Sequence, residues 1–386
     1  MMGDRRATVS VVVPTYNRER YIGECLESIL AQSRAADQVI VVDDGSTDGT
    51  PQVLSRFGSA IEVLRQPNGG KSRALNHALQ HVRGSLVWIF DDDDVAEQDS
   101  LATRCEVLEA DPRADFVYSG HRIGRDGPDG RIVAGPVYRL PPVAEGHLPQ
   151  ALAQGCFFTQ QGVLARRALY EQVGPFDEEF RRGQDYEMLL RMARAGRGIA
   201  LDRPTFVFRR HEGVRGAAGH EHDSRQRDAV WMQSEHRIAL RLRERWPLQA
   251  FLGQDEADRL DEPGALRRAL LHRMASMASK GVWQWVVDDA VAAAAQVPAR
   301  PLDEAERQLC RRAATREFMQ VALREHLSDF VEAARPLARS PSGRDVLAAW
   351  VHGLVWVARH PEPERLTAAA AARAALRVGA LRALRV

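Results

Sequence analysis

Lysine is almost absent from this sequence. Of its 53 basic residues only two are lysines, Lys71 and Lys280, and the others are arginines. A bias of this kind reflects genomic base composition, so the abundance of arginine is weak evidence for phosphate recognition. The net charge of +1 gives no indication of nucleic-acid binding either. In such a background a retained lysine is informative, and Lys71 is therefore singled out.

Cysteine is also scarce. The four cysteines form no CxxC pair, so a zinc site is not expected. They are interpreted as small, buried residues of a protein in a reducing compartment. They are Cys25, Cys105, Cys156 and Cys310.

Long hydrophobic runs are missing as well. The longest candidate, Val346 to Ala358, is interrupted by His352 and is too short to span a bilayer. At the N-terminus, Arg5 and Arg6 precede only a short apolar run before Pro14, which is unlike a signal peptide. We therefore expect a soluble, cytoplasmic protein with no transmembrane segment.

Strand and helix patterns alternate through the first part of the chain. Apolar runs rich in β-branched residues begin near positions 9, 39, 61 and 86, and helical spacing follows them. This alternation predicts an α/β fold with a doubly wound, mostly parallel sheet. Residues 124–147 are rich in Gly and Pro and predict a variable loop. Ala-, Leu- and Arg-rich helical segments follow, so we expect an α/β domain over 1–227 and an α-helical domain over 228–386.

The most informative stretch is Leu86–Asp94, in which five apolar residues run directly into four aspartates. The apolar run predicts a strand buried on both faces. Ligands of open α/β sheets bind at the carboxyl ends of the strands, where these carboxylates would lie. If extended geometry continues, Asp91 and Asp93 point to one side and offer hard oxygen ligands for Mn²⁺ or Mg²⁺. The alternative is a solvated acidic loop, but the buried strand favours a metal site.

Two further turns follow predicted strands. The strand Val39–Val42 ends in Asp43 and Asp44, and the Gly-Ser-Thr-Asp run behind them also suits a helix cap. Later, Asn68-Gly69-Gly70 leads into a helix that begins at Lys71. Glycines before a helix N-terminus can hold a phosphate, although the GxxxxGK[ST] pattern of a Walker loop is absent. Both turns are candidate ligand sites with a purely structural alternative.

Five segments within about the first 215 residues resemble, in their sequence and in their order, segments of family 2 glycosyltransferases. These are inverting enzymes with the GT-A fold. No single segment is decisive, but five in the right order are hard to reach by chance. They are Val11–Asn17, Val41–Asp48, Asn68–Asn76, Phe90–Asp94 with its DxD pattern, and Val173–Asp177 followed by Gln184–Tyr186. The resemblance does not extend to the helical region.

The resemblance implies roles for the matching residues. Asp185 would be the catalytic base, although Gln184 stands where the family often has Glu. Asp91 and Asp93 would bind the metal, and His211 lies where some members carry a late metal ligand; its alternative is a structural histidine. The residues implied in nucleotide-sugar binding are Pro14, Thr15, Tyr16, Asn17, Asp43, Asp44, Arg73, Asp91 and Asp92.

The expected function is metal-dependent, inverting transfer of a single sugar from a nucleotide-diphosphate sugar, a UDP-sugar, to a hydroxyl acceptor. A divalent cation would neutralise the leaving diphosphate, and a carboxylate would take the proton of the attacking hydroxyl. The QxxRW pattern of processive synthases is absent, which favours one sugar per visit. Two alternatives stay open: a sugar nucleotidyltransferase, although no glycine-rich basic loop follows the first strand, and a catalytically inactive sugar-nucleotide-binding module on a helical scaffold.

The helical region is harder to interpret. Its last segment is basic, but Arg373 and Arg382 fall on roughly opposite sides of a helix, which favours packing against protein over lying in lipid. We expect this region to shape the acceptor side or to make a homodimer contact. A polysaccharide, glycolipid or other lipid-linked acceptor would suit a peripheral position at the inner face of the membrane.

Overall fold

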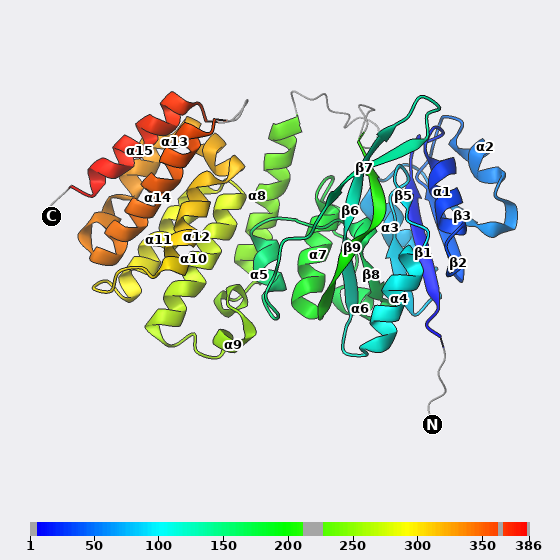
Figure 1. Ribbon diagram of the computed structural model, residues 1–386, viewed down its shortest axis with the longest axis horizontal. Coiled ribbons are helices and arrows are strands. Elements are labelled where there is room, and N and C mark those ends of the chain that lie inside the picture. The colour runs from blue at the N-terminus through cyan, green and yellow to red at the C-terminus, as the bar shows by residue number, and fades with distance from the viewer. Residues whose placement is uncertain (1–5, 211–226, 362–365, 384–386) are drawn as a thin grey trace. The chain divides into compact units, whose positions relative to one another are not determined.

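The structure is a computed structural model that describes residues 6–210, 227–361 and 366–383. The chain divides into two compact units. The first comprises Met1–Pro142 and Cys156–Arg227 and is an α/β unit; the second comprises Val143–Gly155 and Asp228–Val386 and is α-helical (Figure 1). The short segment 143–155 therefore packs with the helices, which nothing in its sequence indicates.

The α/β unit is built on one sheet of nine strands, in the order β3-β2-β1-β4-β8-β6-β9-β5, with β7 paired to β6. The strands are β1 (Val9–Thr15), β2 (Gln38–Asp43), β3 (Glu62–Arg65), β4 (Leu86–Ile89), β5 (Val95–Ala96), β6 (Phe116–Asp126), β7 (Ile132–Tyr138), β8 (Leu164–Arg166) and β9 (Gly198–Arg209). The helices of this unit are α1 (Ile22–Leu30), α2 (Thr50–Ser55), α3 (Lys71–Leu79), α4 (Ser100–Ala110), α6 (Arg167–Val173) and α7 (Gln184–Ala195), with 3₁₀ turns η1 (Gly58–Ala60) and η2 (Gln160–Gly162).

The first four strands form a parallel half-sheet whose order changes direction at β1. β2 and β3 lie successively on one side of β1, whereas β4 pairs with β1 on the other side. The carboxyl ends of β1 and β4 therefore flank a topological switch point, which is where open α/β sheets bind ligands. Every residue of β1, β2 and β4 is buried, as the continuous apolar runs predict.

The second half of the sheet is mixed. β8 is antiparallel to both β4 and β6, whereas β9 runs parallel to β6 and antiparallel to the short β5. The expectation of a loop over 124–147 is wrong for much of that range, because β6 continues to Asp126 and pairs with β7 in a hairpin. The residues of β7 are half-buried or exposed, so this strand lacks a strong apolar alternation. Its Gly and Pro residues, which are uncommon in strands, also favour the prediction of a loop.

One cluster of the core of the α/β unit lies on one face of the sheet. Alternate residues of β1, β2 and β4 pack there against α1, α2 and α4, with Trp88 fully buried among them. α3 instead contacts β1 and β2 through Ala74, Leu75 and Ala78, which do not belong to that cluster. Helices thus cover both faces of the parallel half-sheet, and the strand ends are left to carry polar residues.

The second unit consists of helices, most of them joined by short turns. They are α5 (Leu148–Ala153), α8 (Arg227–Arg245), α9 (Gln254–Ala257), α10 (Pro263–Ser279), α11 (Trp283–Gln296), α12 (Glu304–Thr315), α13 (Glu317–Ala333), α14 (Pro341–Arg359) and α15 (Ala368–Leu381), with 3₁₀ turns η3 (Leu248–Phe251) and η4 (Arg335–Arg339). In the parts of the chain that the structure describes, none of the helices has the length and apolarity needed to cross a bilayer.

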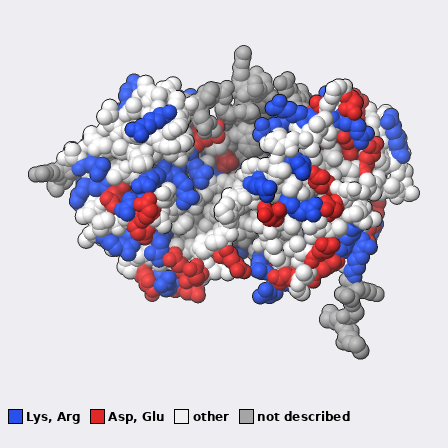
Figure 2. All heavy atoms as spheres, in the orientation of Figure 1, with Lys and Arg blue, Asp and Glu red and all other residues white. Residues whose placement is uncertain are grey.

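Buried acidic side chains of the helical unit are paired with arginine. Glu306 accepts two hydrogen bonds from the fully buried Arg267, at 2.8 and 2.6 Å. Asp289 likewise accepts from Arg273 at 2.9 and 2.6 Å. On the face drawn in Figure 2, acidic and basic side chains are interspersed over the described surface of each unit.

Candidate functional site

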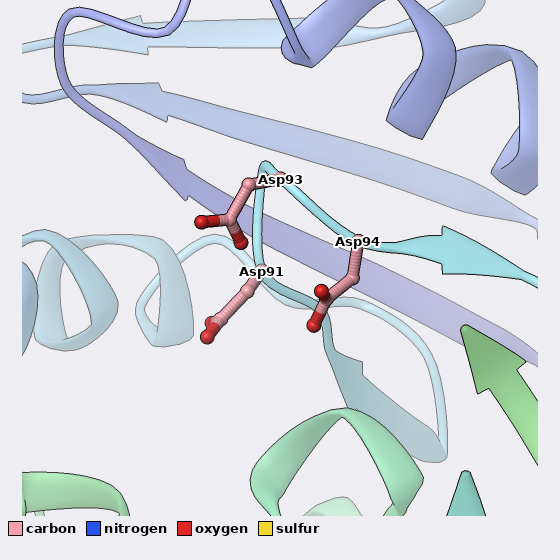
Figure 3. A group of neighbouring side chains, drawn as sticks. All are labelled: Asp91, Asp93 and Asp94. Carbon is pink, nitrogen blue, oxygen red and sulfur yellow. The ribbon is translucent and has the colours of Figure 1, made fainter. Parts of the chain in front are cut away.

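The acidic turn, residues 91–94, follows β4 directly. Burial alternates along it: Asp92 and Asp94 are buried, whereas Asp91 and Asp93 are partly exposed. One carboxylate oxygen each of Asp91, Asp93 and Asp94 lies within 4.8 Å of the others. Figure 3 shows Asp91 and Asp93 pointing to the same side of the turn, with Asp94 beside Asp91. The structure therefore brings the two predicted metal ligands together, and it adds Asp94 to the cluster.

Asp91 has two partners from distant parts of the chain. Its Oδ1 atom forms an ion pair with Lys71 Nζ at 2.5 Å, and its Oδ2 atom accepts from Gln161 Nε2 at 2.8 Å. Burial raises the pKa of Asp91, and Lys71 opposes that effect while Asp93 and Asp185 add to it. Lys71 is the first residue of α3, so the N-terminus of this helix positions the lysine ammonium group at the acidic turn.

Asp94 is held by polar groups rather than by a cationic side chain. Its Oδ1 atom accepts from the backbone N–H of Arg209, and its Oδ2 atom accepts from Gln161 Nε2, both at 2.8 Å. Burial raises the pKa of Asp94 well above its ordinary value, and the charges of Asp93 and Asp91 raise it further. Arg209 also donates from Nε to the Asp93 carbonyl at 2.8 Å, so the end of β9 fixes the backbone of the turn.

Asp92 lies near the segment that follows β1. Its Oδ1 atom lies 3.4 Å from Arg18 Nε. Burial raises the pKa of Asp92 to about 7, while the charge of Arg18 and the nearby Thr15 side chain oppose the shift. The predicted nucleotide-sugar residues Thr15 and Asp92 are therefore neighbours at the switch point.

Asp185 lies in the first turn of α7, behind Gly183, whose φ of 70° lets the chain enter the helix. Asp185 Oδ1 accepts from the backbone N–H of Tyr186 at 2.8 Å. Burial lowers the pKa of Lys71, but Asp91, Asp185 and Asp93 outweigh it, and the pKa lies above its ordinary value. Lys71 thus interacts electrostatically with Asp185, the predicted base, and with Asp91 and Asp93, the two predicted metal ligands. Glu187, by contrast, is bound to Arg191 at 2.8 Å.

The turn after β2 uses its carboxylates differently. Asp44 Oδ1 accepts from Gln66 Nε2 at 2.7 Å and from Gly69 N at 2.9 Å, and its Oδ2 atom accepts from Gly70 N at 2.7 Å. Asp44 therefore holds the glycine turn that precedes α3. Asp43 is also buried, and accepts from Ser46 N at 2.8 Å.

The remaining predicted nucleotide-sugar residues lie at the end of β1 and the start of α3. Pro14 is buried within β1, and Tyr16 is partly exposed just beyond it. Asn17 has a positive φ of 51°, and its side-chain oxygen accepts from Thr47 N at 2.8 Å, so it joins the β1 end to the β2 turn. Arg73 is exposed and lies over Gly69. His211 lies outside the described residues.

Sequence reasoning missed Gln161 and Arg209. Both are buried, and each contacts the acidic turn from a segment far along the chain. Glutamine and arginine occur in many settings, and only the pairing of β4 with β8 and of β5 with β9 brings these segments to the turn. Nothing local in the sequence signals either contact.

Comparisons with known proteins agree with this geometry. Residues 10–174 match the family model described as glycosyl transferase family 2. This match covers less than half of the chain, and it shows that residues 10–174 are similar to glycosyl transferase family 2. The matched residues include the ends of β1, β2 and β4, the glycine turn and Gln161.

Two similar relatives come from Pasteurella multocida. A hyaluronan synthase is 29% identical over 197 residues, which are 50% of this chain and 19% of the relative. A chondroitin synthase is 29% identical over 192 residues, which are 49% of this chain and 19% of the relative. The chain thus spans about a fifth of the length of these two curated relatives.

A solved structure shares the fold. The crystal structure of residues 1–349 of S. aureus TarS, in complex with UDP-GlcNAc, has a TM-score of 0.53 and 20% sequence identity, with 93% of each chain covered. The prediction of a GT-A-type α/β fold followed by an α-helical region is confirmed.

Proposed function

We propose that this protein transfers a single sugar from a nucleotide-diphosphate sugar, a UDP-sugar, to a hydroxyl acceptor, with inversion at the anomeric carbon. The observation that carries the proposal is the arrangement around Lys71. Its ammonium group forms an ion pair with Asp91 and interacts electrostatically with Asp93 and Asp185. Asp91 follows β4 at the switch point between β1 and β4. This arrangement supports the binding of a cation and the uptake of a proton by carboxylates at the same edge of the sheet.

The donor nucleotide is assigned to the β1 side of this edge. Thr15, Tyr16 and Arg73 would contact the base and ribose, together with Asp43 of the β2 turn. Asp92 lies beside Thr15 and belongs to the same side. The choice of UDP is supported by the TarS structure, which was solved in complex with UDP-GlcNAc. Both Pasteurella multocida relatives are synthases of sugar polymers, which supports a carbohydrate substrate.

The acidic turn fits a divalent cation such as Mn²⁺ or Mg²⁺. Three carboxylates converge within 4.8 Å, and oxygen ligands of this type suit both ions. Burial raises the pKa values of Asp91 and Asp94, the neighbouring carboxylates add to the rise, and a bound cation would oppose it. Asp91 and Asp93 would hold the ion. When bound, the cation supplies neutralisation of the charge that develops on the departing diphosphate.

Asp185 is assigned as the general base. An acceptor oxygen would form the new bond to the anomeric carbon from the face opposite the diphosphate. The bond from that carbon to the diphosphate oxygen would break, and its electron pair would leave with the diphosphate. Asp185 would take the hydroxyl proton. The pairing of Glu187 with Arg191 leaves Asp185 as the better placed acid of this helix turn.

Release of UDP from UDP-sugars in the presence of Mn²⁺ tests this function. The wild-type chain should release UDP, and Asp185→Asn should lose about two to four orders of magnitude in turnover while donor binding stays nearly intact. Glu187→Gln is the matched control in the same helix turn and should retain turnover if it folds. A chain that binds UDP-sugars but releases no UDP with any acceptor is an inactive binding module. The anomeric configuration of the product, read by NMR, tests inversion.

The helical unit is proposed to serve the acceptor side or self-association, and residues 1–227 to form the catalytic domain. Light scattering on the intact chain at micromolar concentrations tests self-association. A monomer would remove that role and leave acceptor recognition.

A further inference from the structure

The side chain of Gln161 joins two members of the acidic cluster. It lies in η2, is 3% exposed, and belongs to none of the motifs that carry the family resemblance. Its Nε2 atom donates to Asp91 Oδ2 and to Asp94 Oδ2, at 2.8 Å in each case. A single amide group therefore sets the separation of two carboxylates that would otherwise repel each other.

The orientation of this amide follows from its partners. An ionised carboxylate only accepts hydrogen bonds, so the NH₂ end must face Asp91 and Asp94. Rotating the amide would direct Oε1 at both carboxylates and would remove two charge-assisted hydrogen bonds. The Oε1 atom is buried and has no hydrogen-bond partner among the described residues. The fold thus leaves one polar atom of Gln161 unpaired while it keeps both contacts to the cluster.

The backbone of Gln161 is anchored independently of its side chain. Its carbonyl accepts from Trp88 Nε1 at 2.7 Å and from Arg104 at 3.3 Å, and both donors are fully buried. Trp88 belongs to β4, the strand that leads into the acidic turn, and Arg104 lies over its ring at 4.2 Å. The amide therefore reaches Asp91 from a rigid support tied to the same strand.

We propose that Gln161 is a positioning residue for the acidic turn. It holds Oδ2 of Asp91 against Asp94, and thereby orients Oδ1 toward the place that Lys71 Nζ occupies and that a divalent cation would use. This inference rests on the proposed function, in which Asp91 and Asp93 bind that cation. Second-layer hydrogen bonds of this kind orient metal ligands, and their loss typically weakens metal binding about 10- to 100-fold.

The neighbouring residue, Gln160, provides a matched control. Gln160 is 1% exposed, and its Nε2 atom donates to the Tyr170 hydroxyl at 2.7 Å instead of to a carboxylate. Gln161→Met and Gln160→Met each replace a buried amide by an apolar side chain of similar length. A general loss of packing or of a buried hydrogen bond should affect both variants alike, whereas a positioning role concerns only residue 161.

The experiment measures UDP binding to the intact chain by calorimetry as Mn²⁺ is varied. For Gln161→Met, the Mn²⁺ concentration that gives half-maximal UDP binding should rise about 10-fold or more. For Gln160→Met it should stay within about twofold of wild type, even where the melting temperature falls. Turnover at saturating Mn²⁺ should change less than the Mn²⁺ requirement. Gln161→Asn, which keeps an amide but is one methylene too short to span both carboxylates, should also raise the Mn²⁺ requirement and serves if the Met variant does not fold.

The outcomes are distinguishable. If Gln161→Met or the Asn variant needs no more Mn²⁺ than wild type, or if Gln160→Met shifts equally, the positioning role is overturned and the proposed function stands. If UDP binds the wild-type chain equally well with Mn²⁺ and with EDTA, the metal assignment fails and this inference falls with it.

Discussion

Two turns of the α/β unit share one sequence pattern, but their aspartates have different hydrogen-bond partners and different exposure. After β2 and after β4, a buried apolar strand runs directly into aspartates. In the β2 turn, both oxygens of Asp44 accept hydrogen bonds from Gln66 and the glycine turn. In the β4 turn, Asp91 and Asp93 stay partly exposed and converge with Asp94. A strand that ends in carboxylates therefore indicates a polar edge, and their hydrogen-bond partners decide what they do there.

The difference lies in how the negative charge is compensated. Backbone N–H groups of the glycine turn donate to both oxygens of Asp44, so its negative charge is compensated within the fold. The β4 turn gathers four aspartates, and burial raises the pKa values of Asp91, Asp92 and Asp94. Charge left uncompensated by the protein is typical of functional sites, where a ligand supplies the balance.

The largest expected effect comes from Asp91→Asn. Removing this carboxylate should lower turnover on the order of 10²-fold or more, because neutralisation of the leaving diphosphate is worth several kcal/mol. UDP binding should also lose its dependence on Mn²⁺, as measured by calorimetry with and without EDTA. If the Asp91→Asn variant kept wild-type turnover and that turnover were still sensitive to EDTA, the cation would bind elsewhere. The proposed difference between the β2 turn and the β4 turn would then be wrong.

Asp44→Asn should act mainly on stability. An amide offers only one acceptor oxygen, so at least one of the N–H groups of Gly69 and Gly70 would lose its partner. Gly69 is exposed and Gly70 partly exposed, so water can replace the lost partner and the loss of unfolding free energy should be about 1 kcal/mol. Chemical denaturation of the metal-free protein measures this loss. An unchanged midpoint together with lost UDP binding would instead make Asp44 a ligand residue, as the family resemblance implies.

Asp92→Asn should change how stability depends on pH. The pKa of Asp92 is raised to about 7 in the folded protein by burial. Because the unfolded carboxyl has a pKa of about 4, the folded form binds more protons between these values. The contribution of Asp92 to wild-type stability should therefore fall as pH rises from about 4 to about 7, and level off above that. The gain of the Asn variant over wild type in the absence of metal should be on the order of 2 kcal/mol larger at pH 8 than at pH 5. An identical difference at both pH values would contradict the raised pKa.

The smallest effect is expected for Arg65→Gln. Arg65 Nε lies 3.5 Å from Asp43 Oδ2, but the arginine side chain is 61% exposed. Exposed ion pairs contribute roughly 0–1 kcal/mol, and Asp43 keeps the hydrogen bond from Ser46. The denaturation midpoint should shift less than that of Asp44→Asn. A loss as large as the Asp44 variant's would show that arginine, and not the backbone, stabilises the β2 turn.

Much of the α/β unit could be predicted from the sequence because its signals are local. Continuous apolar runs indicate β1, β2 and β4, and helical spacing indicates α1 and α3. The order of these elements sufficed for the fold class, which the TarS similarity confirms. Strand ends carrying Asp43, Asp44 and Asp91–Asp94 predicted, before any pairing was known, which edge of the sheet would carry the acidic side chains.

The rest depends on pairings that leave no local trace. The β6–β7 hairpin is only half-buried, so its strand β7 lacks the apolar signal of a central strand. The packing of 143–155 with the helical unit is likewise a tertiary result. Gln161 and Arg209 reach the acidic turn across 67 and 116 residues of sequence respectively. The predicted roles of Asp185 and of the nucleotide-sugar residues stay predictions until variants are measured.

The ion pair between Lys71 and Asp91 has a consequence for communication between the two turns. Asp44 binds the N–H of Gly70, Gly70 precedes Lys71, and Lys71 binds Asp91. The turn after β2 is thus connected to the turn after β4 through the first residue of one helix. Under the proposed function, a cation that displaced Lys71 from Asp91 would act on the start of α3, and a nucleotide that contacted the glycine turn would act on the same residue. Thermodynamic linkage then requires that each ligand alter the affinity for the other by the same factor.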